Sequence, residues 1–187
     1  MEKYEMLRET SIKVGNHTLC RIKALIDFGD VCAGELGGYI ESEKNLSHRG
    51  SCWICNDSKV YGNAEISDHA KVISGIVYGN AKISGYAEVI SGVVYGNAKI
   101  SGYAEVRYST VYDNVAISDD SKVRYSTVYD NVAISDDSKV NGSVVYGNVE
   151  ISEDAEVSGS TVYGNVEISN GAEVSGGTVT GKKQRMP

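Results

Sequence analysis

A pattern of apolar and polar positions repeats every 17 residues along most of the chain, starting at Tyr61. Within a repeat, an aliphatic residue opens each of three units of six, six and five residues, as Val77, Ile83 and Val89 do. Turn-forming pairs such as Gly79 and Asn80 follow the aliphatic residues. Apolar spacings of six and five residues fit neither the 3.6-residue period of an α-helix nor a heptad. The pattern therefore predicts three short strands and three corners in every repeat.

Three strands and three corners per repeat favour a triangular coil that places one parallel strand on each side. Equivalent residues of successive coils would then stack about 4.8 Å apart, so seven coils would form a prism about 34 Å long. Residues 107–123 and 124–140 share one 17-residue sequence, which indicates duplication of a modular unit. The expected fold class is all-β, a parallel β-helix of about seven 17-residue coils.

Residues 1–53 lack the repeat and predict a separate β cap. Polar and apolar residues alternate from Tyr4 to Val14 and from Thr18 to Phe28, on either side of the hairpin turn signal Gly15 and Asn16. A third extended piece is expected at 38–42. A cap of this kind would cover the open edge of the first coil. The expected organisation is a cap at 1–53, a β-helix at 54–181 and a basic tail at 182–187.

Two sequence features resemble known families. The unit that begins with an aliphatic residue and carries a small residue four positions later resembles hexapeptide-repeat proteins, which implies a left-handed coil; the third unit of each repeat is one residue short of that pattern. The stretch DFGDVCAGELGGYIESEKNLS (27–47), followed by Cys52 and Trp53, resembles the N-terminal signature of phage- and prophage-encoded β-helix proteins. Bacterial relatives of that family are labelled acyltransferases or polymer-forming proteins, so the resemblance implies a fold more than an activity.

Two polar columns recur in every repeat. Asparagines two residues after each tyrosine are expected to form a structural amide ladder at a corner. The tyrosines follow inward valines and should point outward, either stacking to cover a corner or forming an interface, which includes an interface between copies in a dimer or trimer. The members of this tyrosine ladder are Tyr61, Tyr78, Tyr95, Tyr112, Tyr129, Tyr146 and Tyr163.

Acidic residues concentrate in the C-terminal half of the repeats. The whole chain has a net charge of −7, but residues 107–181 alone hold 12 acidic and 4 basic side chains. Three readings of this excess are open: solubility, calcium binding, and engagement of a basic protein surface. We expect the third, with a partner-binding acidic face made of Asp113, Asp119, Asp120, Asp130, Asp136, Asp137, Glu153 and Asp154.

Signals for catalysis are sparse. The chain has three histidines, and His69 is expected at a solvent-exposed corner without the inserted loop that hexapeptide acyltransferases place beside their histidine. No nucleophile elbow or dinucleotide fingerprint occurs. Cys52 and Cys55 have zinc-like spacing but should face opposite sides of a strand, so reduced thiols are expected for these two, Cys20 and Cys32. We expect no catalytic residues, no cofactor and no bound metal.

These observations favour a non-enzymatic interaction protein. The expected partner is a host protein, such as a basic nucleic-acid-binding effector that a phage-encoded anti-defence inhibitor would block by mimicking nucleic acid. The net negative charge argues against direct nucleic-acid binding. The absence of an 18-residue apolar run argues against a membrane span and favours the bacterial cytoplasm. An acyltransferase-like enzyme and a structural, polymer-forming solenoid remain the alternatives.

Overall fold

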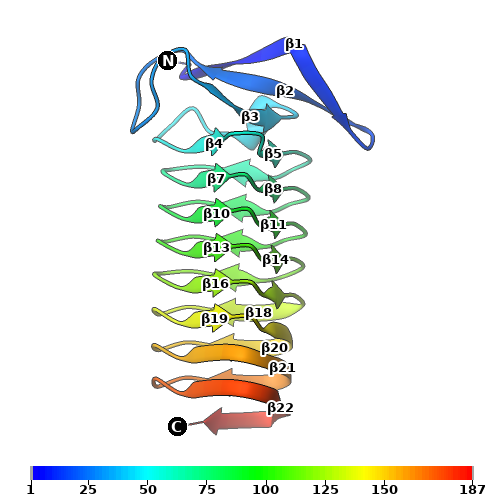
Figure 1. Ribbon diagram of the computed structural model, residues 1–187, viewed down its shortest axis with the longest axis vertical. Coiled ribbons are helices and arrows are strands. Elements are labelled where there is room, and N and C mark those ends of the chain that lie inside the picture. Colours follow the sequence, from blue (N-terminus) through cyan, green and yellow to red (C-terminus); the bar gives the residue numbers. More distant parts are fainter. Residues whose placement is uncertain (1, 187) are drawn as a thin grey trace.

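The structure is a computed structural model that describes residues 2–186, and for 182–186 it describes the backbone alone. A column of stacked β-coils carries a β cap at its N-terminal end, and the chain ends at the opposite end of the column (Figure 1). In the described part of the chain, no helix is long and apolar enough to cross a lipid bilayer.

The coils have three sides, each a stack of short parallel strands in register with the coil before and after. Face A contains β6 (Glu65–Ile66), β9 (Lys82–Ile83), β12 (Lys99–Ile100), β15 (Ala116–Ile117) and β18 (Asn131–Ile134). Face B contains β4 (Trp53–Cys55), β7 (Lys71–Ile73), β10 (Glu88–Ile90), β13 (Glu105–Arg107), β16 (Lys122–Arg124) and β19 (Lys139–Asn141). Face C contains β5 (Lys59–Val60), β8 (Ile76–Val77), β11 (Val93–Val94), β14 (Thr110–Val111) and β17 (Thr127–Val128).

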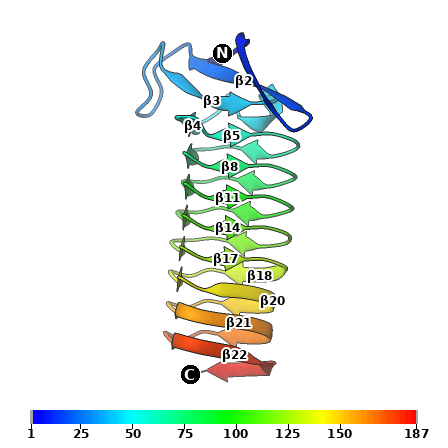
Figure 2. The ribbon, with the colours of Figure 1, turned by 45° about the vertical axis from the view of Figure 1, so that its right-hand side comes forward.

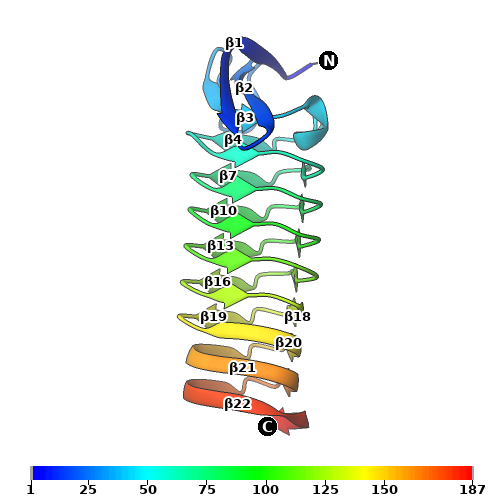
Figure 3. The same cartoon turned by 90° about the vertical axis from the view of Figure 1, so that its right-hand side faces the viewer.

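Three long strands complete the column by bending around its corners. They are β20 (Val144–Ile151), β21 (Glu156–Ile168) and β22 (Glu173–Met186). With β4 and the first residues of β21 and β22, face B has eight levels among the described residues, and it faces the viewer in Figure 3. The predicted parallel β-helix with a 17-residue period is confirmed, with about eight turns because partial turns extend beyond the seven repeats that the tyrosines mark. The predicted handedness stays a prediction.

Inward columns of identical or similar side chains build one continuous core. Ile83 and Ile100 are completely buried on face A, as are Val89 and Val106 on face B. Ala81 and Ala98 are completely buried beside a corner, and buried valines such as Val115 take the equivalent positions of later coils. Burying each aliphatic side chain contributes about 1.5–3 kcal/mol, so the free energy of folding comes mainly from these columns.

The cap continues the solenoid rather than forming a separate layer. Strands β1 (Tyr4–Val14) and β2 (His17–Ala24) form the predicted hairpin, and β3 (Leu36–Ile40) replaces the expected 38–42 segment. Because β3 pairs antiparallel with β2 and parallel with β5, the cap sheet runs into face C (Figure 2). A 3-10 turn, η1 (Glu43–Asn45), follows. The predicted cap therefore closes the first coil through main-chain pairing. The side chains of the predicted basic tail, 182–187, lie outside the described residues.

Modularity can be tested by deletion. Removing residues 124–140, one of the two identical repeats, should leave a folded protein that is one coil shorter, because each coil contacts only its neighbours. Circular dichroism should show the same β spectrum and a cooperative thermal transition at a slightly lower temperature. Loss of the cooperative transition would contradict a solenoid built from independent repeats.

Candidate functional site

Six of the predicted acidic residues lie together at the corner between faces A and B. Within this corner, one pair of acidic residues follows β15, one follows β18 and one follows β20, so the pairs stack on successive coils. All six side chains are exposed. We call this group the acidic ridge: Asp119, Asp120, Asp136, Asp137, Glu153 and Asp154.

The backbone of the ridge is held in a conformation that suits glycine better than a side chain. Asp119, Asp136 and Glu153 have φ values of 58°, 52° and 53°. The equivalent positions of the two preceding coils are Gly85 and Gly102, both at φ 67°. Glutamate at positive φ is more strained than glycine, since its Cβ crowds the backbone. The acidic side chains therefore occupy positions where glycine would cost less.

Local hydrogen bonds orient part of the ridge. The Ser118 hydroxyl donates to Asp119 at 2.8 Å, and the Ser135 hydroxyl donates to Asp136 at 3.0 Å. These bonds fix the first carboxylate of two successive pairs while leaving it exposed. Within residues 2–186, no group of three or more His, Cys, Asp and Glu side chains is arranged to hold a metal ion.

The other two predicted acidic residues do not join the ridge. Asp113 and Asp130 lie at the corner between faces C and A, directly after Tyr112 and Tyr129. They occupy the left-handed position that Gly79 takes in an earlier coil, with φ values of 61° and 66°. Asp130 accepts a hydrogen bond from the Gly147 amide at 3.1 Å, so it ties one coil to the next. The expectation that this pair lies near the other six is corrected: face A separates the two corners.

The tyrosine ladder is a continuous stack of rings at the corner between faces C and A. Successive ring centroids are 4.8–5.1 Å apart, and the planes are within 5° of parallel. His17 of the cap packs on the end of the stack, its ring centroid 4.9 Å from that of Tyr61 and its plane tilted by 46°. The Glu41 carboxylate contacts His17 Nδ1 at 2.9 Å, and this hydrogen bond lowers the pKa of Glu41. The cap is thus attached to the ladder as well as to face C.

The asparagine ladder is confirmed as a chain of side-chain hydrogen bonds beside the tyrosines. Each amide Nδ2 donates to the Oδ1 of the next coil at 2.8–3.2 Å. Every internal member donates once and accepts once, so the ladder satisfies itself along the axis. Its members are Asn63, Asn80, Asn97, Asn114, Asn131, Asn148 and Asn165.

Sequence reasoning missed a second aromatic stack, which occupies the ridge corner in earlier coils. His69 stacks on Tyr86 at 4.5 Å, and Tyr86 stacks on Tyr103 at 4.9 Å. The next residue of this column is Asp120. One corner is therefore aromatic in its N-terminal half and acidic in its C-terminal half. The 17-residue register places these residues in one column, and that signal was available in the sequence.

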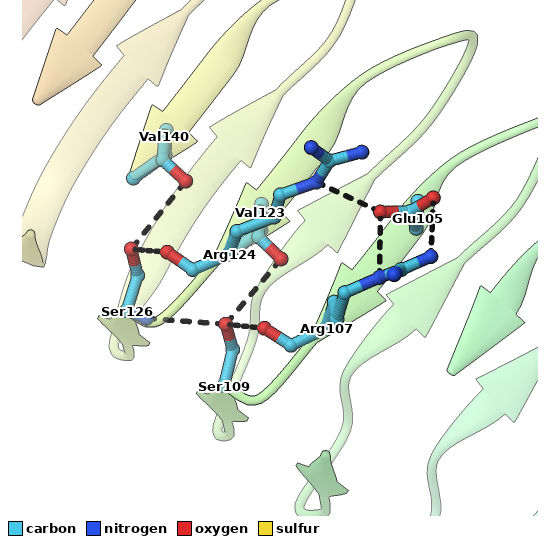
Figure 4. Close-up of polar contacts among 7 residues, drawn as sticks. All are labelled: Glu105, Arg107, Ser109, Val123, Arg124, Ser126 and Val140. Atoms are coloured by element: carbon cyan, nitrogen blue, oxygen red, sulfur yellow. Dashed lines mark hydrogen bonds and ion pairs between the residues drawn. The ribbon is translucent and has the colours of Figure 1, made fainter. Parts of the chain in front are cut away.

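Face B carries cations beside the ridge (Figure 4). Glu105 lies between two stacked arginines and forms ion pairs with Arg107 Nε at 3.2 Å and Arg124 Nε at 2.8 Å. At the next corner, the buried Ser109 hydroxyl donates to the Arg107 carbonyl at 2.8 Å and accepts from the Ser126 amide at 3.1 Å. These contacts join adjacent coils. The paired arginines have a carboxylate partner, whereas no ridge residue forms an ion pair with a basic side chain among the described residues.

The cysteines are free thiols in the described residues. Cys52 is buried and Cys55 is partly exposed, as the strand alternation predicts. The buried ammonium of Lys3 lies 3.2 Å from Cys52 Sγ and donates to the Cys52 carbonyl at 2.9 Å. Burial raises the pKa of the Cys52 thiol, and the nearby Lys3 opposes that effect.

Comparisons with known proteins agree with this architecture. Residues 108–184 match the family described as GlmU-like, C-terminal hexapeptide. A 58-residue segment is 40% identical to a protein named "Uncharacterized acetyltransferase YdcK" of Escherichia coli (strain K12). That segment is 30% of this chain and 18% of the relative, so the chain matches under a fifth of the relative's length. The matches support a hexapeptide-repeat β-solenoid.

The tyrosine ladder should make the folded protein less stable at alkaline pH. Burial raises the pKa of Tyr78, and the neighbouring Tyr95 and Tyr61 raise it further; burial also raises the pKa of Tyr112 and Tyr129. A raised pKa in the folded state gives stability that is complete below the unfolded value of about 10 and is lost as pH rises through the folded value. Tyr78, Tyr112 and Tyr129 replaced together by phenylalanine should match wild type at pH 7 and melt at a higher temperature above about pH 10. If the melting temperatures of wild type and the triple variant fall equally between pH 7 and alkaline pH, the ladder is not the cause of the loss.

Proposed function

We propose that the protein is a non-enzymatic binding protein whose acidic ridge engages a basic surface of another protein. The observation that carries this proposal is the ridge itself: six exposed carboxylates on three adjacent coils, five of them at residues with the positive φ that favours glycine. Stability does not account for these residues. Carboxylates stacked about 4.8 Å apart repel by nearly 1 kcal/mol even in water, and the positive φ values add strain.

The charge density of the ridge suits a partner that binds nucleic acid. Two carboxylates per coil, with coils about 4.8 Å apart, give about one charge per 2.4 Å, compared with one per about 1.7 Å along duplex DNA. A basic channel that accepts a phosphate backbone would therefore meet a similar field at the ridge. The proposal includes a host effector as partner, bacterial cytoplasm as location, and phage or prophage origin with an anti-defence role. Two features support these details of partner, location and origin: residues 27–47 resemble the signature of phage- and prophage-encoded β-helix proteins, and the ridge is strongly acidic.

A second candidate is an acyltransferase-like enzyme, favoured by the acetyltransferase-named relative and by one polar pair. The Ser51 hydroxyl lies 2.8 Å from His69 Nδ1, where the cap meets the first coils, and the His69 ring is held by Tyr86. In such a pair the hydroxyl can act as the nucleophile and the imidazole as the general base that accepts its proton. This candidate predicts thioester cleavage of acetyl-coenzyme A that His69→Ala abolishes and that His48→Ala leaves intact. Equal background rates in wild type and His69→Ala would exclude it.

The ridge can be tested by neutralising it. In this six-fold variant, asparagine replaces the five ridge aspartates and glutamine replaces Glu153. The variant should no longer capture basic proteins from a bacterial lysate. Its melting temperature should rise, because the repulsion between the carboxylates is relieved. Capture by wild type should weaken as salt rises, since screening acts over about 8 Å at physiological ionic strength.

The matched control neutralises carboxylates on face A. Glu150→Gln with Glu167→Gln changes charge on the last ridge coil and on the coil after it but leaves the ridge intact, and should retain capture measured by quantitative mass spectrometry. Undiminished capture by the six-fold variant, or equal loss in the control, would contradict the role of the ridge.

A further inference from the structure

Charge is excluded from one of the three sides of the column. On faces A and B the outward strand positions carry charges of both signs along the axis, such as Lys99 and Glu150 on face A and Lys122 and Glu156 on face B. On face C no outward strand position after Lys59 is charged. These positions are Ile76, Val93, Thr110, Thr127, Val144, Thr161 and Thr178.

The tyrosine ladder lies immediately beside this uncharged stripe. From Tyr78 onward, each ladder tyrosine is two residues after a stripe residue, with one buried valine between them, so Thr127 and Tyr129 flank buried Val128. The paired strands of face C form one continuous stack (Figure 2). Their β-branched outward residues and the stacked phenol rings at the adjoining corner are therefore two parallel stripes. Val144 is 38% exposed, Thr178 is also exposed, and the other stripe residues are partly exposed.

This composition is typical of the centre of a protein interface. Charged residues are depleted there and tyrosine is enriched, while single apolar residues scattered over a surface are ordinary. Exposed faces of a solenoid that stay in water have no reason to exclude charge, and faces A and B do not exclude it. A contiguous uncharged surface on one side of an otherwise charged protein indicates that this side is covered.

We infer that face C is the surface through which two copies of this chain associate. A second copy carries the same two stripes at the same spacing of about 4.8 Å, so every coil finds an equivalent partner. A two-fold axis parallel to the column would set the tyrosine ladder of each copy against the β-branched stripe of the other, which makes the contact self-complementary.

The size of face C is sufficient for such an interface. Seven coils at about 4.8 Å give a length of about 34 Å, and the strand with its flanking corner gives a width of about 15 Å. Each copy would bury about 500 Å², or about 1,000 Å² in total, which reaches the size expected of a biological interface but is below the about 1,200–2,000 Å² of stable ones, so the expected association is weak. The contact avoids the hydrogen-bonded asparagine ladder, whose exposed amides can form its rim.

Association through face C would leave the acidic ridge free. The ridge is the corner between faces A and B, which is the corner opposite face C in a three-sided column. A dimer of this kind would present two ridges pointing away from each other. The inference does not rest on the proposed function, because association is measured without any binding partner.

Sedimentation equilibrium of the purified full-length chain tests the inference. We expect close to twice the 20.1 kDa chain mass at about 0.1 mM, a concentration at which association with a dissociation constant of about 1 μM is nearly complete. Thr127→Arg combined with Val144→Arg should weaken association at least about ten-fold, because two unpaired cations would be buried at the contact.

The matched control is Ala116→Arg with Ala133→Arg, two exposed outward positions of face A. This variant should remain a dimer, and circular dichroism should confirm folding of both variants. A monomeric wild type, a mass other than two chains, or equal dissociation by the face A and face C variants would overturn the inference.

Discussion

The stacking of each inward aliphatic side chain on its equivalent in the next coil is the interaction on which the rest of this structure depends. Val89, Val106 and Val123 are completely buried one above another on face B, and the isoleucine column does the same on face A. A shift of one residue in any coil would turn an aliphatic side chain outward and a polar one inward. The core therefore fixes the 17-residue register, and the register fixes every outward column.

Because the register is fixed, an outward residue always lies next to its own equivalents, and the chemistry of the side chain decides whether that is favourable. Tyrosines stack and asparagine amides bond to one another, so both ladders add stability. Carboxylates repel, and the ridge keeps six of them at one corner. On face B, by contrast, the repulsion between the stacked Arg107 and Arg124 is relieved, because the Glu105 carboxylate forms ion pairs with both. The ridge lacks that compensation, which supports a role in binding.

The repeat was strong enough to predict the fold, the three strands per coil and the two ladders, because each depends on local spacing. The hairpin turn at Gly15 and Asn16 was also visible, since turn chemistry is local. Contacts between the cap and the coils were not visible. His17 on Tyr61, Ser51 on His69 and Lys3 on Cys52 join residues whose separation follows no period.

The candidate site was predicted only in part for a similar reason. The acidic pairs after Ile117, Ile134 and Ile151 share one column and were grouped correctly. Asp113 and Asp130 belong to another column, and their separation by face A follows from counting positions within the repeat. The uncharged character of face C is a property of a whole side of the column, so it became evident only when the strands were assembled.

We propose that this column divides its surface, with face C covered by a second copy and the opposite corner left open for a partner. Hydroxyl-radical footprinting read by mass spectrometry tests this claim directly, because tyrosines lie on both sides. We predict that oxidation of Tyr95, Tyr112 and Tyr129 rises when the protein is diluted, while oxidation of Tyr86 and Tyr103 does not change. Dilution that leaves all five tyrosines unchanged, or that exposes both sets equally, would contradict the division.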